Sequence, residues 1–125
     1  MMLLWVGLGG AIGSILRYLI SQALHGSTGL FPIGTMAVNV IGSIILGALF
    51  AMQETSGEVF KQSMWLFLTV GICGGFTTFS TFGLETYLLW KEKHVVEAML
   101  YMISSMIVAP ASIASGYAII KSIQS

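Results

Sequence analysis

Long runs without charged side chains divide the chain into apolar segments. Between Tyr18 and Gln53 only the titratable His25 interrupts such a run. As one helix this interval of about 36 residues would be about 54 Å long, whereas the hydrocarbon core of a bilayer is about 30 Å thick. The chain must therefore turn back within the run. The turn is predicted at residues 25–32, where glycines free the backbone and Pro32 suits the first turn of a new helix.

The remaining charged positions mark the other boundaries, because charged side chains are expensive in hydrocarbon. Glu54, Glu58 and Lys61 mark one polar connection, and residues 91–94 mark the next. The pattern predicts an all-α membrane protein with one transmembrane domain over residues 1–125. Its four transmembrane helices are expected at about 3–24, 33–52, 63–90 and 96–120. Each is long enough to cross a bilayer, which takes about 20 residues.

The composition leads to the same class of protein. Hydrophobic residues make up 56% of the 125 residues and charged residues 8%, whereas soluble domains are about 25% charged. A soluble domain of this size would bury only about two-thirds of its surface, so many apolar side chains must face lipid. The net charge is zero and no basic cluster is present, which argues against nucleic-acid partners. The single Cys73 excludes a disulfide within the chain.

The distribution of positive charge gives little direction to membrane insertion. Four spans place both termini on one side, together with Lys61 and Lys121. The other side holds Lys91 and Lys93, and Arg17 if its side chain reaches out. Because Lys and Arg counts set orientation, this near balance permits insertion in both directions and an antiparallel homodimer. The alternative is that a small bias suffices to fix one orientation.

The third span contains a segment that disfavours a regular helix. Residues 74–83 read Gly-Gly-Phe-Thr-Thr-Phe-Ser-Thr-Phe-Gly. Paired glycines followed by two threonines are poor helix formers, so the helix is predicted to be broken near residues 74–78. In a membrane such a break survives where its freed backbone groups line a cavity or bind an ion. The alternative is a continuous helix whose Ser and Thr hydroxyls bond back to the preceding turn.

Aromatic and neutral polar residues supply candidate ion contacts. Phe79 and Phe82 are three residues apart and lie on one helix face. Contact with lipid is the common explanation of such a pair. The alternative is that the positive edges of the two rings face a small anion. Asn39 lies in an apolar helix, where its amide either bonds another helix or donates to an anion. Hydroxyl groups that would extend such a path belong to Ser43, Ser80, Thr81, Tyr101 and Ser105.

Two charged residues within spans are functional candidates by position. Arg17 lies in the first span, and Glu85 lies about one turn beyond Phe82. Either they pair, or Arg17 draws anions into a vestibule while Glu85 caps or braces a dimer. His25 and His94 are far apart in sequence and do not predict a metal site. No nucleophile with a general base and no phosphate loop is recognisable, so an enzyme is not expected.

The sequence Gly-Gly-Phe-Thr-Thr-Phe-Ser-Thr-Phe at residues 74–82 resembles the signature of the Fluc (CrcB-type) fluoride channels. Residues 9–13, Gly-Gly-Ala-Ile-Gly, followed by Arg17 and Tyr18, resemble the first helix of that family. Residues 35–42, including Asn39, are similar to its second helix. With four spans in about this length, the resemblance covers essentially the whole chain.

The resemblance implies a passive, fluoride-selective channel of the cell inner membrane that exports fluoride from the cytoplasm. It implies an antiparallel dual-topology homodimer in lipid with two fluoride pathways. The carbonyls of Gly74 and Thr77 from both subunits would hold a central sodium ion. Pore residues implied by the match are Phe79, Phe82, Asn39, Ser80, Thr81, Tyr101 and Ser105.

Two other functions are compatible with about four spans. A small multidrug exporter also has about four helices, but it needs an acidic residue in its first helix, where this chain has Arg17 and no Asp or Glu. A membrane subunit without transport activity would use the glycine and phenylalanine motif for packing alone.

Overall fold

The computed structural model describes residues 1–26 and 29–125, and every regular element in these ranges is helical. Ser27 and Thr28, which belong to the predicted turn at 25–32, lie outside the described residues. The elements are α1 (Met2–Ala23), α2 (Ile33–Ser56), α3 (Gln62–Leu66), the π-helix η1 (Phe67–Cys73), α4 (Gly74–Phe76), α5 (Ser80–Lys91) and α6 (Val95–Gln124).

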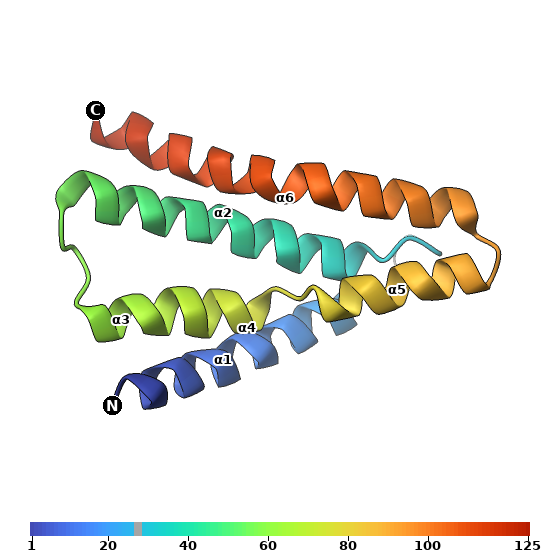
Figure 1. Ribbon diagram of the computed structural model, residues 1–125, viewed down its shortest axis with the longest axis horizontal. Helices are drawn as coiled ribbons and strands as arrows, with labels where there is room; N and C mark the ends of the chain where they lie inside the picture. Colours follow the sequence, from blue (N-terminus) through green and yellow to red (C-terminus); the bar gives the residue numbers. More distant parts are fainter. Residues whose placement is uncertain (27–28) are drawn as a thin grey trace.

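Within residues 1–26 and 29–125, four helical segments are long and apolar enough to cross a membrane, which confirms the predicted number of spans. They are Met2–Ala23, Ile33–Ser56, Gln62–Lys91 and Val95–Gln124. Both chain termini lie at one end of the bundle, together with the connection at residues 57–61 (Figure 1). The turn at residues 92–94 lies at the opposite end. The structure is therefore that of an all-helical, multi-pass membrane protein.

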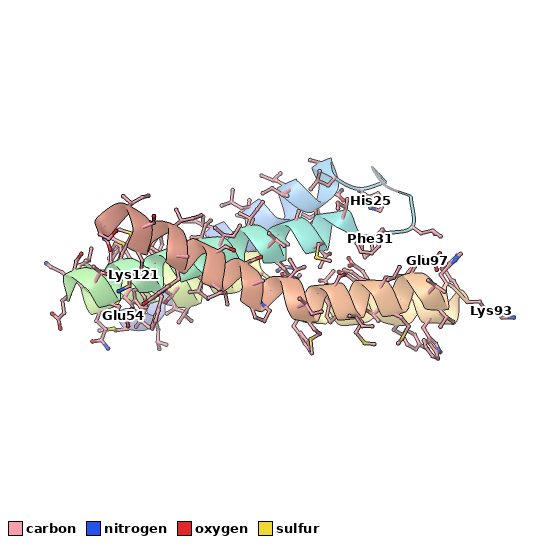
Figure 2. The ribbon with its side chains drawn as sticks, turned by 90° about the horizontal axis from the view of Figure 1, so that it is seen from above. His25, Phe31, Glu54, Lys93, Glu97 and Lys121 are labelled. Atoms are coloured by element: carbon pink, nitrogen blue, oxygen red, sulfur yellow. The ribbon has the colours of Figure 1, made fainter. Side chains whose placement is uncertain are left out.

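The second and fourth spans extend beyond the ends expected at 52 and 120. At these ends Glu54 accepts a hydrogen bond from the Tyr117 hydroxyl, and its Oε2 atom lies 3.5 Å from Lys121 Nζ. Lys121 Nζ also lies 5.4 Å from the centre of the Tyr117 ring. Figure 2 shows Glu54 and Lys121 side by side at one end of the bundle. The two charges compensate each other, so neither has to end its helix.

Glycines set the spacing between helices. A Cβ atom on Gly9 would lie 2.8 Å from the Gly71 Cα atom, which ties α1 closely to the third span. A Cβ atom on Gly47 would lie 2.8 Å from the carbonyl carbon of Ile113, which does the same for α2 and α6. In lipid the hydrophobic effect does not drive helices together, so close packing of their backbones at small residues stabilises the contact instead. The described part of the chain thus contains two closely packed helix pairs, α1 with the third span and α2 with α6, which contact each other mainly between α5 and α6 and between α1 and α2.

Candidate functional site: a groove beside the third span

The backbone of the third span is not helical between Phe76 and Ser80. The helix α4 ends at Phe76, Thr77 is extended with φ −84° and ψ 160°, and α5 begins at Ser80. The seven-residue π-helix η1 directly precedes α4. In such a stretch the regular helical hydrogen bonds from each N–H to the carbonyl four residues earlier are missing. Its backbone N–H and C=O groups therefore need other hydrogen-bond partners.

Asn39 supplies partners for this stretch from α2. Its Nδ2 atom donates to the Thr78 carbonyl at 3.1 Å, and its Oδ1 atom accepts from the Thr78 amide at 2.8 Å. The Thr78 hydroxyl in turn accepts from the amide of Thr81 at 3.2 Å and satisfies the start of α5. Of the two sequence-based interpretations of Asn39, the interhelical bond is present. Its amide group carries a second N–H that this pair of bonds does not use.

Arg17 and Glu85 bind separate partners rather than each other. The Nε atom of Arg17 donates to the Gly75 carbonyl at 3.0 Å. The carboxylate of Glu85 accepts from Thr35 Oγ1 at 2.6 Å and from the Tyr101 hydroxyl at 2.7 Å. Among the described residues, Arg17 and Glu85 therefore do not form the direct pair that was one of the two interpretations. Arg17 instead holds the backbone just before the non-helical stretch.

A groove of 530 Å³ lies against this stretch. Its walls include six residues that the sequence singled out as ion contacts: Asn39, Ser43, Gly74, Thr77, Phe79 and Ser105. Its other walls are mainly apolar and come from α2, η1 and α6, among them Met36, Leu46, Cys73, Met106 and Pro110. The groove therefore combines a few uncharged donors with a hydrophobic surround, an arrangement that holds a small ion weakly.

Phe79 and Phe82 have different surroundings although they lie three residues apart. The Phe79 side chain is 78% exposed and lines the groove. The Phe82 side chain is buried in a cluster with Leu89, Ala98 and Tyr101. The ring centres of Phe79 and Phe82 are 5.6 Å apart, and those of Phe82 and Tyr101 are 5.1 Å apart in an edge-to-face arrangement. The two phenylalanines thus connect the groove to the core.

The other predicted pathway residues surround this pair. Ser80 and Thr81 form the first turn of α5, and the Ser80 hydroxyl lies 3.4 Å from that of Thr78. Tyr101 is fully buried, and its hydroxyl donates a hydrogen bond to Glu85. The Ser105 hydroxyl, one turn further along α6, donates weakly to the Met36 sulfur at 3.8 Å. Of the predicted hydroxyl residues, Ser43 and Ser105 thus line the groove, whereas Ser80, Thr81 and Tyr101 are not among its described lining residues.

Two carbonyl groups beside the groove have the chemistry of cation ligands. The Thr78 amide, which would bond the Gly74 carbonyl in a regular helix, is bound to Asn39 instead. Among the described residues no hydrogen bond reaches the carbonyl oxygen of Gly74 or of Thr77. Gly74 is also exposed on the subunit surface. Free carbonyl oxygens of this kind suit a monovalent cation, so the backbone here fits the sodium site that the sequence resemblance implied.

Three residues that contribute to the groove or to its hydrogen bonds were not predicted from the sequence. Thr35 and Thr78 bind Glu85 and Asn39 respectively. Thr35 could have been found, because it lies one turn before Asn39 on the same helix. Pro110 lies inside α6 and lines the groove with Met106, whose carbonyl lacks the usual helical donor because proline has no N–H. That signal was also visible in the sequence.

Comparison with known proteins identifies relatives along nearly the whole chain. The family model described as "CrcB-like protein, Camphor Resistance (CrcB)" matches residues 4–117. A fluoride-specific ion channel FluC of Nitrobacter winogradskyi is 39% identical over 123 residues, which are 95% of this chain and 94% of that protein. Proteins of the same name from Methylobacterium sp. (strain 4-46) and Helicobacter pylori (strain G27) are 42% and 36% identical, over 93% and 94% of this chain. The matches cover 93% and 92% of those two relatives.

Proposed function

Because this chain belongs to the CrcB-like family, whose curated relatives are named fluoride-specific ion channels, we propose that it conducts fluoride passively out of the cytoplasm. It is a transporter rather than an enzyme. Passive loss of fluoride lowers its concentration inside the cell and so reduces its toxicity. The observation that carries the proposal within the structure is the groove of uncharged donors beside the non-helical backbone at residues 77–79.

The groove provides the interactions that a small anion needs in place of water. Asn39, Ser43 and Ser105 offer N–H and O–H donors without a full positive charge. The edge of the exposed Phe79 ring carries the positive end of its quadrupole and adds a weak attraction. Conduction requires binding that is strong enough for an ion to arrive and weak enough for it to leave. Neutral donors and ring edges meet that requirement better than a lysine or arginine would.

The two competing functions fit the structure less well. A proton-coupled drug exporter would need a carboxylate in the first span, and α1 contains Arg17 and no acidic residue. That arginine is also bound to the third span rather than open to a substrate. A subunit that only packs against others would not need a groove with uncharged donors. The channel accounts for both features.

The direct measurement is ion flux from liposomes that contain the purified protein. With a potassium gradient and valinomycin setting the voltage, we expect fluoride to leave the vesicles while chloride is retained. A fluoride electrode and a chloride electrode record the two fluxes from matched preparations. Equal flux of both halides, or none of either, would reject the channel assignment.

The channel is proposed to be an antiparallel homodimer that inserts in both orientations in the inner membrane. In a single subunit the groove and the exposed Phe79 side chain and Gly74 backbone remain open. A two-fold partner would cover the same surface on both subunits. The nearly even distribution of lysine and arginine between the two membrane sides supports insertion both ways.

Dual topology predicts that the C-terminus occurs on both membrane faces. Alkaline phosphatase fused after Ser125 reports a periplasmic terminus, and green fluorescent protein at the same position reports a cytoplasmic one. We expect substantial signal from both fusions at comparable expression. Signal from one reporter alone would contradict the antiparallel dimer while leaving the flux result intact.

The central cation is proposed to be sodium, held by the carbonyls of Gly74 and Thr77 from both subunits. The support is that these oxygens lack donors among the described residues and that Gly74 lies on the open face of the subunit. Held between two backbones in this way, the ion would join the subunits rather than take part in conduction.

Removal of sodium should therefore stop fluoride flux. After exchange into choline salts during purification and reconstitution, we expect flux to fall to background and to return when sodium is restored. Emission spectroscopy should detect sodium that copurifies with the untreated dimer. Undiminished flux from protein shown to be free of sodium would contradict this site.

A further inference from the structure

A second cavity lies at the end of the bundle opposite the termini. It has a volume of 310 Å³ and lies between the end of α1, the chain around residues 29–34 and α5. We call it the loop cavity. Its walls include His25, Phe31, Thr35 and Glu85. Because Glu85 binds both Thr35 and Tyr101, this cavity reaches the polar network that lies behind the groove.

The loop cavity and the groove approach each other on consecutive residues of α2. Thr35 lines the loop cavity and Met36 lines the groove. On α6, the fully buried Tyr101 binds the carboxylate that lines the loop cavity, and Ser105 one turn later lines the groove. Tyr101 therefore lies between residues of both cavities, bonded to Glu85 on one side and one helical turn from Ser105 on the other.

Phe31 contacts Tyr101 from the side of the loop. Its ring lies edge-on to the Tyr101 ring, with centres 5.4 Å apart and planes at 76°. Phe31 and Met36 both pack against the cluster that contains Phe82 and Tyr101. Figure 2 shows Phe31 at the N-terminal end of α2, near the loop that carries His25. One residue from the wall of each cavity, Phe31 and Met36, thus packs against the same aromatic cluster.

We propose that Phe31 is a specificity-determining residue, whose ring sets the width of the passage between the loop cavity and the groove. The inference rests on the proposed function, since it concerns the same ion path. A passage narrowed by the rigid rings of Phe31 and Tyr101 would admit fluoride and exclude the larger chloride. Pore width and the donors that line it are sufficient to discriminate between ions of different size.

The test compares fluoride and chloride flux in liposomes for the wild-type protein and for Phe31→Ala. We expect the variant to lower the fluoride-to-chloride flux ratio by about tenfold or more, which corresponds to about 1.4 kcal/mol of discrimination. Phe31→Leu, which retains most of the apolar volume, should keep a ratio close to that of the wild type. Loss of packing alone would reduce both fluxes together and leave their ratio unchanged.

The control is Phe50→Ala, which removes the same ring from an exposed position near the far end of α2. It should keep the wild-type ratio. If Phe31→Ala does not assemble, Phe31→Val takes its place with the same expected direction. An unchanged ratio in the assembled variant overturns the role of Phe31 while the wild-type fluoride flux still supports the channel. Absence of fluoride flux in the wild type would instead reject the proposed function.

Discussion

Replacing Asn39 with alanine should lower fluoride conduction by about thirtyfold or more. The side chain makes two hydrogen bonds to the Thr78 backbone, and both are lost in the variant. Each unsatisfied backbone group in such a site costs about 1–3 kcal/mol, so the observed conformation loses about 2 kcal/mol or more. That free energy corresponds to about a thirtyfold change in population. The variant also removes the second N–H of an amide that lines the groove.

Fluoride efflux from liposomes measures the effect, and size-exclusion chromatography shows whether the variant keeps the oligomeric state of the wild type, which is proposed to be a dimer. Gln62→Ala is the control, because it removes an amide side chain from an exposed position at the start of α3. Asn39→Asp adds a second test, since it retains the acceptor for the Thr78 amide but loses the donor and introduces a repelling charge. Wild-type flux in an assembled Asn39→Ala dimer would contradict the role of this side chain in the pathway.

The apolar pattern was sufficient to predict the spans because lipid imposes a strong constraint on sequence. A run from Tyr18 to Gln53 with no formal charge cannot remain one helix, and the structure contains the two helices that this argument requires. The ends of the second and fourth spans were less predictable. Glu54 and Lys121 suggest helix ends when each is considered alone, but they lie together across two helices and compensate each other.

The hydrogen-bond partners in the site could not be deduced from spacing, because they join residues far apart in the chain. Asn39 and Thr78 are 39 positions apart, and Thr35 and Glu85 are 50 apart. The sequence identified Asn39, Arg17 and Glu85 as unusual in their spans. It did not show that Arg17 binds the Gly75 carbonyl or that Glu85 binds two hydroxyls. Those contacts depend on how the α1 and α2 helices rotate against the third span.

The same limit applies to the aromatic residues. Helical spacing placed Phe79 and Phe82 on one face, yet the irregular backbone before Ser80 exposes one ring and buries the other. The result is a continuous series of ring contacts from Phe31 through Tyr101 and Phe82 to Phe79. Because interiors are closely packed, a shape change at one ring affects the position of its neighbours. The series therefore connects the loop cavity to the groove.

Phe82 lies in the middle of this series, and its aromatic character can be removed with little change in volume. Phe82→Leu keeps an apolar side chain against Tyr101, so assembly should be retained. It removes the positive ring edge and two ring contacts, one edge-to-face with Tyr101 and one tilted with Phe79, and such contacts are worth about 0.5–1.5 kcal/mol each. With contacts to both Phe79 and Tyr101 lost, fluoride conduction should fall by about tenfold or more.

The matched control for this change is Phe67→Leu, made in the same span. The Phe67 ring packs edge-on against Trp5, with centres 5.7 Å apart, and it is not among the described residues that line the groove. Efflux from liposomes should be close to wild type for this control and low for Phe82→Leu at equal amounts of assembled dimer. If both leucine variants conduct alike, Phe82 contributes only volume to the core, and the ring edges have no part in moving the ion.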